Sequence, residues 1–181
     1  MKKITIVSAS IREGRKSHWV AQSLLEAFGI HEEVNVQLLD LKKYTFPVME
    51  IRMNQLDSLP EGLQEFSDAL STADGIIFVS PEYKNGIPGT LKNALDFLNP
   101  QIIKRIPFGV ASVTSGGFGG LLCLSQLRTV GLALGGIAIP EKLCVSKVND
   151  LYSEDGTLLD ESLQEKINAF AESVLWYVQR F

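Results

Sequence analysis

Cysteine and histidine are scarce in this chain, which has two of each among its 181 residues. Cys123 and Cys144 form no CxxC pair, and His18 and His31 lie far from both in the sequence. Two scattered cysteines and two histidines make no ligand cluster, so the spacing excludes a structural zinc site. We expect two small buried thiols in a reducing cytoplasm, and neither a disulfide nor a redox pair.

The chain also lacks a basic run, a signal peptide and an unbroken membrane span. Its net charge of −4 argues against binding nucleic acid or an anionic membrane through bulk charge. The first apolar run, residues 4–7, is too short for a signal peptide. Residues 108–127 carry no charge, but glycines interrupt them. We therefore interpret this stretch as strand, loop and helix, since loops cannot face lipid.

Short apolar runs alternate with helical patterns along the whole chain. The apolar runs predict strands, and the one at 75–79 is apolar without alternation, as in a strand covered on both faces. Apolar residues at helical spacing predict the helices, with Gly29 ending the first and Pro88 in the first turn of the third. The predicted strands are 4–7, 34–39, 75–79, 108–113 and 137–139, the last resuming at 143–145, and the helices cover 20–28, 63–73, 91–98, 119–134 and 163–174.

Five β-α units with short connections predict a single α/β domain over residues 1–181. Right-handed crossovers give a five-stranded parallel sheet with helices on both faces. Five strands favour the flavodoxin-like three-layer sandwich, with strand order 2-1-3-4-5. In that order, strands 1 and 3 flank the switch point, and ligands bind beyond their carboxyl ends.

The loop after the first strand, residues 8–18, is rich in hydroxyls and cations and leads into a helix. Ser10 and Ser17 can donate hydroxyl hydrogen bonds, and Arg12 can make a forked contact to phosphate. A helix N-terminus also attracts anions. The alternative is a solvated basic turn in which Ser17 caps the helix. Neither GxGxxG nor a P-loop is present, which counts against classical dinucleotide and nucleoside-triphosphate binding.

Two further loops fall at the same predicted edge of the sheet. Residues 80–89 contain two prolines and two glycines around Tyr83, which offers an aromatic face. Residues 114–120 contain four glycines, and exposed amides there can bind an electron-rich ring edge or an oxyanion. A plain turn is the alternative for each loop. Three such loops on one edge favour a binding site.

Residues 81–98, PEYKNGIPGTLKNALDFL, resemble the PEYN-x-S-x-P-x-x-LKNALD signature of the NAD(P)H-dependent FMN reductases. Chromate, quinone and azo-dye reductases are among that family. Its phosphate loop, GSxRxxSxN, is similar to residues 9–12 followed, after a longer spacing, by 17–18. The resemblance covers about residues 4–139.

The chain departs from the family pattern at four places. Ala9 and His18 stand where the family has glycine and asparagine in the phosphate loop, and Lys84 and Gly86 replace Asn and Ser. Asn85 can substitute for the missing asparagine by a shift of one residue. These departures affect individual contacts more than the identity of the cofactor.

The resemblance implies FMN as cofactor, NADPH or NADH as hydride donor, and a small-molecule electron acceptor: a quinone, azo compound, metal oxyanion or flavin. It also implies a homodimer or homotetramer. It places the phosphate at the first loop, the isoalloxazine ring at the second and the pyrimidine edge at the third. No catalytic side chain and no metal is expected, because the flavin carries the chemistry. The expected cofactor-binding residues are Ser10, Arg12, Ser17, His18, Trp19, Pro81, Glu82, Tyr83, Lys84, Asn85, Gly86, Thr114, Ser115, Gly116 and Gly117.

The principal alternative is a non-catalytic flavodoxin-type electron carrier or flavin-binding protein. The Arg12 loop, the PEY motif and the small net charge favour the reductase. A serine hydrolase at Ser115 is disfavoured, since Val113 replaces the first glycine of GxSxG and both histidines precede the serine. A phospho-receiver is disfavoured, since Ser80 and Pro81 stand where its acidic pattern would place aspartate. The long segment 41–60 is interpreted either as a lid or as simple packing.

Overall fold

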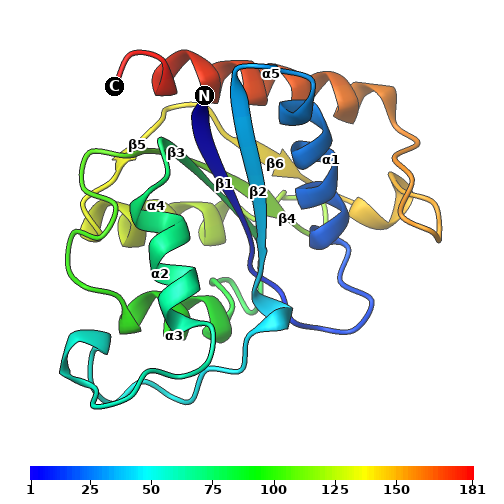
Figure 1. Ribbon diagram of the computed structural model, residues 1–181. Helices are drawn as coiled ribbons and strands as arrows, with labels where there is room; N and C mark the ends of the chain where they lie inside the picture. Colours follow the sequence, from blue (N-terminus) through cyan, green and yellow to red (C-terminus); the bar gives the residue numbers. More distant parts are fainter.

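The computed structural model describes residues 1–181, with a parallel sheet at its centre (Figure 1). The four long strands lie in the order β2 (Val34–Asp40), β1 (Lys2–Ser8), β3 (Gly75–Pro81) and β4 (Pro107–Val113). Beyond β4, the short strands β5 (Ile137–Ala138) and β6 (Leu143–Val145) both pair with it in parallel. The predicted order 2-1-3-4-5 is confirmed. The fifth strand is interrupted at Pro140, which has no N–H to donate to a ladder.

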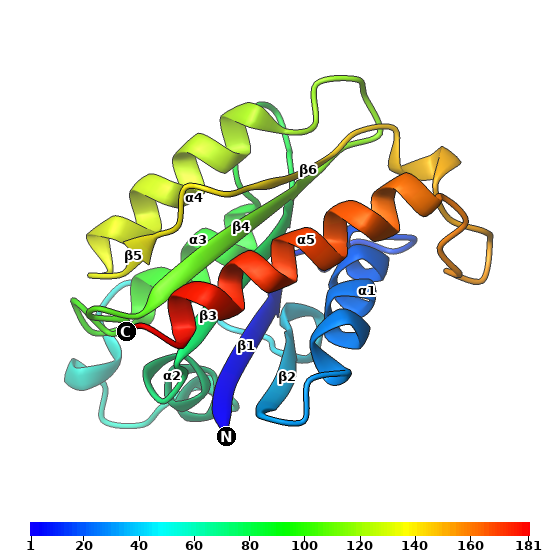
Figure 2. The ribbon, with the colours of Figure 1, turned by 90° about the horizontal axis from the view of Figure 1, so that it is seen from above.

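Helices cover both faces of the sheet (Figure 2). One face carries α1 (Ser17–Gly29) and α5 (Glu161–Val178), and the other carries α2 (Leu63–Ser71), α3 (Gly89–Phe97) and α4 (Leu121–Ala133). None of these helices combines the length and apolar composition needed to cross a membrane. Three 3-10 turns complete the elements: η1 (Leu41–Lys43), η2 (Met53–Gln55) and η3 (Val148–Asp150).

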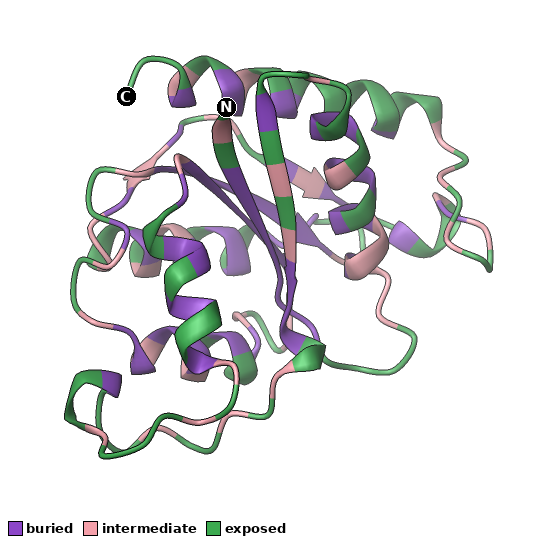
Figure 3. Cartoon of the chain, in the orientation of Figure 1, coloured by how far each residue is buried: buried purple, intermediate pink, exposed green.

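The sheet separates two hydrophobic cores, one on each face, and strand β3 contributes side chains to both. Ile77 and Val79 join the core beneath α1 and α5, whereas Ile76 and Phe78 join the core beneath α2, α3 and α4. All four side chains are fully buried, and Figure 3 shows the sheet interior almost entirely buried. The uniform apolar run therefore corresponds to a strand covered on both faces, as predicted.

Four helix starts differ from the prediction: α1, α3 and α5 begin two or three residues earlier, and α4 begins two residues later. Helix α4 begins at Leu121 because Gly119 and Gly120 have φ values of 64° and 74°, in the left-handed region that a helix excludes. Helix α3 begins at Gly89, and Pro88 precedes it with an extended ψ of 134°. The end of α1 at Gly29 agrees with the prediction.

The long segment 41–60 packs against α2 and α3. Phe46 lies edge-on to Phe66, with ring centroids 5.9 Å apart. The Asn93 side chain, from α3, donates to the Pro47 carbonyl oxygen at 2.8 Å. These contacts favour the packing interpretation over the lid.

Candidate functional site

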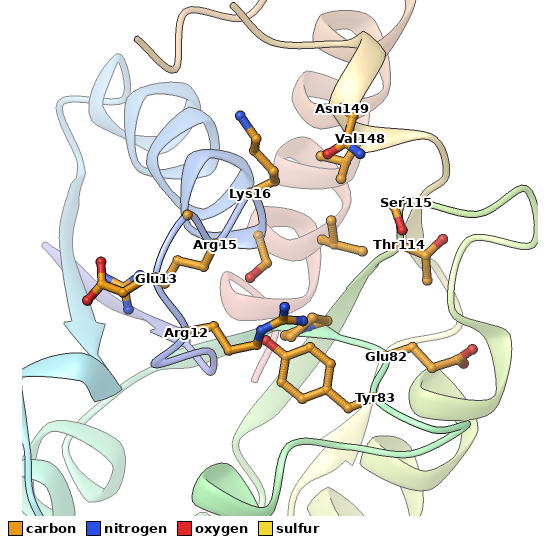
Figure 4. A pocket seen from close by; sticks show the side chains of 14 residues that line it. Arg12, Glu13, Arg15, Lys16, Glu82, Tyr83, Thr114, Ser115, Val148 and Asn149 are labelled. Atoms are coloured by element: carbon orange, nitrogen blue, oxygen red, sulfur yellow. The ribbon is translucent and has the colours of Figure 1, made fainter. Parts of the chain in front are cut away.

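A cleft of about 300 Å³ opens at the carboxyl edge of the sheet, between the loops after β1, β3 and β4 (Figure 4). Its position is the switch point predicted from the strand order. The lining is mainly polar and contains Arg12, Glu13, Gly14, Arg15, Lys16, Ser17, Pro81, Glu82, Tyr83, Val113, Thr114, Ser115, Val148 and Asn149.

All three predicted loops contribute to this cleft. The expected residues that line it are Arg12, Ser17, Pro81, Glu82, Tyr83, Thr114 and Ser115. The other expected residues lie outside the lining: Ser10, His18, Trp19, Lys84, Asn85, Gly86, Gly116 and Gly117. The structure thus brings the three loops together but divides each loop into lining and supporting residues.

The N-terminus of α1 forms the cationic end of the cleft. Ser17 is the first residue of this helix, and its Oγ is buried without a hydrogen-bond partner. The N-cap residue, Lys16, gives no side-chain capping bond, so the alternative in which Ser17 caps the helix is wrong. An unsatisfied hydroxyl, free helix N–H groups and the Arg12 and Lys16 side chains together suit an anion.

The nearby cation Arg15 is already paired. Its guanidinium makes a two-pronged contact with the Asp40 carboxylate at the end of β2, and it also donates to the Ser10 carbonyl oxygen. Burial raises the pKa of Asp40, but the hydrogen bonds from Arg15 and from the Lys42 N–H outweigh it and hold this pKa below 3.8. Arg15 therefore ties the first loop to β2.

Three expected phosphate-loop residues contact other side chains and do not line the cleft themselves. The Ser10 Oγ lies 2.6 Å from the Tyr83 hydroxyl, which links the first loop to the second. The His18 Nδ1 lies 3.0 Å from the Ser8 Oγ, and burial, followed by the charge of Arg15, lowers the His18 pKa. The Trp19 ring packs against Tyr152 at 5.7 Å between centroids. These three side chains hold the loop after β1 in place without lining the cleft.

Tyr83 begins a tight turn that shapes the second loop. Tyr83 and Gly86 exchange both backbone hydrogen bonds, and the two residues between them, Lys84 and Asn85, have φ values of 52° and 65°. Two left-handed residues in a row are typical of a type I′ turn, which favours asparagine and glycine. The Tyr83 ring also lies under the Arg12 guanidinium, 5.3 Å from its centroid. The aromatic face is thus held at the cleft.

The segment after β6 joins the cleft through backbone pairing. The Val148 N–H donates to the Thr114 carbonyl oxygen at 3.1 Å, and the Lys147 N–H donates to that of Gly116 at 3.0 Å. This brings Val148 and Asn149 into the lining, which sequence reasoning missed. No motif marks these residues, and only the pairing of distant backbone segments places them.

The lining contains no histidine or cysteine, and no cluster of three or more metal-ligating side chains is present. The geometry instead suits a long ligand with an anionic end at α1 and a flat ring between Tyr83 and Thr114. The cleft thus presents groups that can bind and orient such a ligand.

Comparison with known proteins agrees with this geometry. Residues 2–150 match the family described as NADPH-dependent FMN reductase. The FMN-dependent NADPH-azoreductase of Staphylococcus haemolyticus is 28% identical over 182 residues, which cover 98% of this chain and 95% of that protein.

Solved structures agree on the fold. FerB, a flavoenzyme NAD(P)H:(acceptor) oxidoreductase from Paracoccus denitrificans, superposes with a TM-score of 0.83 at 21% identity, covering 99% of this chain and 98% of that one. A flavodoxin, WrbA-like protein from Agrobacterium tumefaciens gives 0.64 at 16% identity and 99% coverage of both chains. The family match spans most of the chain and includes all three loops of the cleft, so this protein belongs to the NADPH-dependent FMN reductase family.

Proposed function

We propose that the single domain over residues 1–181 binds FMN in this cleft and transfers electrons from NADPH or NADH to a small acceptor. Quinones, azo compounds, metal oxyanions and free flavin are the proposed acceptors. The observation that carries the proposal is the buried, unpartnered Ser17 hydroxyl at the cationic N-terminus of α1. The azoreductase named above, an FMN-dependent relative, supports an azo compound among the acceptors.

FMN fits the groups that the cleft presents. Its phosphate would bind the Ser17 hydroxyl, the first N–H groups of α1, and the Arg12 and Lys16 side chains. The flavin ring would lie against Pro81 and Tyr83, in the second loop. Its pyrimidine edge would face the third loop, residues 114–117, as the family resemblance implies.

In this proposal the protein binds, orients and stabilises, and the cofactor supplies the redox chemistry. When bound, FMN would supply the redox chemistry that moves hydride from the nicotinamide and electrons to the acceptor. The Thr114 N–H donates to the Val145 carbonyl oxygen at 2.9 Å, so the backbone N–H groups of residues 115–117 would stabilise negative charge at the ring edge, a preorganised electrostatic effect. No side chain of the lining acts as acid or base, and Tyr83 acts by packing.

The proposal is tested by a variant that should weaken the binding of FMN but not of riboflavin, which lacks the phosphate. Ser17→Ala removes one hydrogen bond to a charged group, so FMN binding should weaken by roughly ten- to a hundredfold. Riboflavin, which lacks the phosphate, should bind Ser17→Ala and wild-type protein equally. Ser71→Ala, an exposed serine on α2, is the matched control and should leave both affinities unchanged. Equal FMN binding by Ser17→Ala and wild type would remove the proposed phosphate site.

The proposal also includes a homodimer or homotetramer, an expectation carried by the family resemblance. Light scattering of the purified protein measures the mass directly. A dimer or tetramer mass agrees with the proposal, whereas a mass of 19.9 kDa, that of one chain, contradicts it.

A further inference from the structure

Glu82, in the PEY motif, bonds to a helix as well as lining the cleft. Its Oε2 accepts hydrogen bonds from the N–H groups of Leu122 and Cys123, at 3.1 and 3.0 Å. These are the second and third residues of α4, whose own N-cap, Gly120, provides no side-chain hydrogen bond. A carboxylate at this position satisfies free N–H groups and complements the positive end of the helix dipole. Glu82 therefore caps a helix that begins about 40 residues later in the chain.

A second side chain ties the same loop to the same helix. Gln126, one turn further along α4, donates from Nε2 to the Asn85 carbonyl oxygen at 3.1 Å. The backbone N–H of Glu82 donates in addition to the Val113 carbonyl oxygen at 3.2 Å, at the end of β4. The β3–α3 loop is thus attached to α4 just before its turn and within the turn, and to β4 at its base.

The two loops joined in this way are those that the flavin ring would contact. Residues 81–83 belong to the loop after β3, and Thr114 and Ser115 to the loop that leads into α4. The third loop contains four glycines, two of them with positive φ, and its residues 115–118 are exposed. Such a loop depends on external contacts for a fixed conformation.

We propose that Glu82 is a positioning residue, whose carboxylate locks the β3–α3 and β4–α4 loops together into one preformed wall for the flavin ring. The inference rests on the proposed FMN site. In it, Glu82 acts through the N-terminus of α4 and needs no contact with the ring. The N–H groups at the start of α4 stabilise the negative charge of the Glu82 carboxylate.

Three variants separate this role from simple helix stability. Glu82→Ala removes both hydrogen bonds to α4. Glu82→Gln keeps an oxygen that can accept them, and serves as the conservative rescue. Asp160→Ala is the matched control, because the Asp160 carboxylate caps α5 through the Leu163 N–H at 2.6 Å and does not line the cleft.

The first readout is hydrogen exchange in the protein without flavin. In Glu82→Ala the amides of Leu122 and Cys123 should exchange faster, whereas Glu82→Gln and Asp160→Ala should keep the wild-type protection at these two amides. Wild-type protection in Glu82→Ala would overturn the proposal. Glu82→Asp, which keeps the charge but shortens the reach, should behave as Glu82→Ala and replaces it if that variant does not fold.

The second readout is the affinity for FMN and for riboflavin. Glu82→Ala should weaken both by the same factor, roughly three- to tenfold, the range that corresponds to losing one helix cap. Asp160→Ala should lower the melting temperature and leave both affinities unchanged. Equal weakening by Asp160→Ala, or wild-type affinities in Glu82→Ala, would overturn the positioning role. If the wild-type protein bound neither flavin, the proposed function would fail, while amide exchange would still test the contact with α4.

Discussion

The buried pair of Asp40 and Arg15 allows a quantitative test of how the first loop is held. Asp40→Asn removes the negative charge and leaves the guanidinium without its counter-ion. The two side chains are only 10% and 11% exposed, so little water reaches either group. Breaking a buried pair from one side costs about 3–5 kcal/mol. The new amide oxygen can still accept one hydrogen bond, so we expect the lower end, about 3 kcal/mol.

The double variant Asp40→Asn with Arg15→Met is the control. It removes both charges, and replacing a whole buried pair by uncharged groups is often neutral. Its free energy of unfolding should therefore lie within about 1 kcal/mol of wild type. Urea denaturation of the flavin-free protein measures the stabilities of the wild type, the Asp40→Asn and Arg15→Met single variants, and the double variant. An Asp40→Asn variant as stable as wild type, or a double variant that shows the simple sum of two single losses, would refute the reasoning.

The same pair predicts an acid-sensitive contribution to stability. The pKa of Asp40 is lowered from 3.8 in the folded protein, so the contribution is complete above that value and is lost as pH falls through the lowered pKa. Asp40→Asn should lack this part of the acid transition. An unchanged acid transition in the variant would contradict the assignment.

Three further predictions concern the surroundings of the site. The His18 pKa is lowered from 6.5 in the folded protein, so the free energy of unfolding should fall as pH drops from 6.5 toward the lowered value. His18→Gln should remove this dependence of stability on pH, and an unchanged dependence in the variant would contradict the prediction. Gly131→Ala would place a Cβ 2.3 Å from the Phe108 ring, so thermal denaturation should show a loss of about 1–3 kcal/mol, and wild-type stability would argue against this packing. Burial raises the pKa of Cys123 to about 11, so iodoacetamide should modify Cys123 only in denaturant. Cys144 is half-buried, so the expectation of two buried thiols is wrong for it, and only peptide mass spectrometry that finds Cys123 itself labelled in the folded protein would contradict the prediction.

The fold could be predicted because its signals are local and repeated. The alternation of apolar runs and helical patterns identifies the β-α units, and the non-alternating run of β3 indicates a strand buried on both faces. The start of α4 was missed because it depends on two glycines taking positive φ. The interruption of the last strand at Pro140 was predicted from the sequence, and both of its parts pair with β4.

The candidate site was predicted at the level of loops and less well at the level of side chains. Topology places the loops after β1, β3 and β4 at one edge, so any residue there is a candidate. Whether a side chain faces the cleft depends on its partners, and Ser8 and Tyr152 hold His18 and Trp19 away from the lining. Asn149 enters through backbone pairing between distant segments, which leaves no pattern in the sequence.

The central claim is that this cleft holds FMN and that NADPH or NADH reduces it there. The most direct measurement saturates the purified protein with FMN, removes free flavin, and follows the flavin absorbance without oxygen as each nicotinamide is added. We expect stoichiometric FMN to remain with the protein, to bleach with at least one nicotinamide, and to regain its colour when a quinone or azo dye is added. A protein that retains no FMN, or a bound flavin that stays oxidised with both nicotinamides, would contradict the claim.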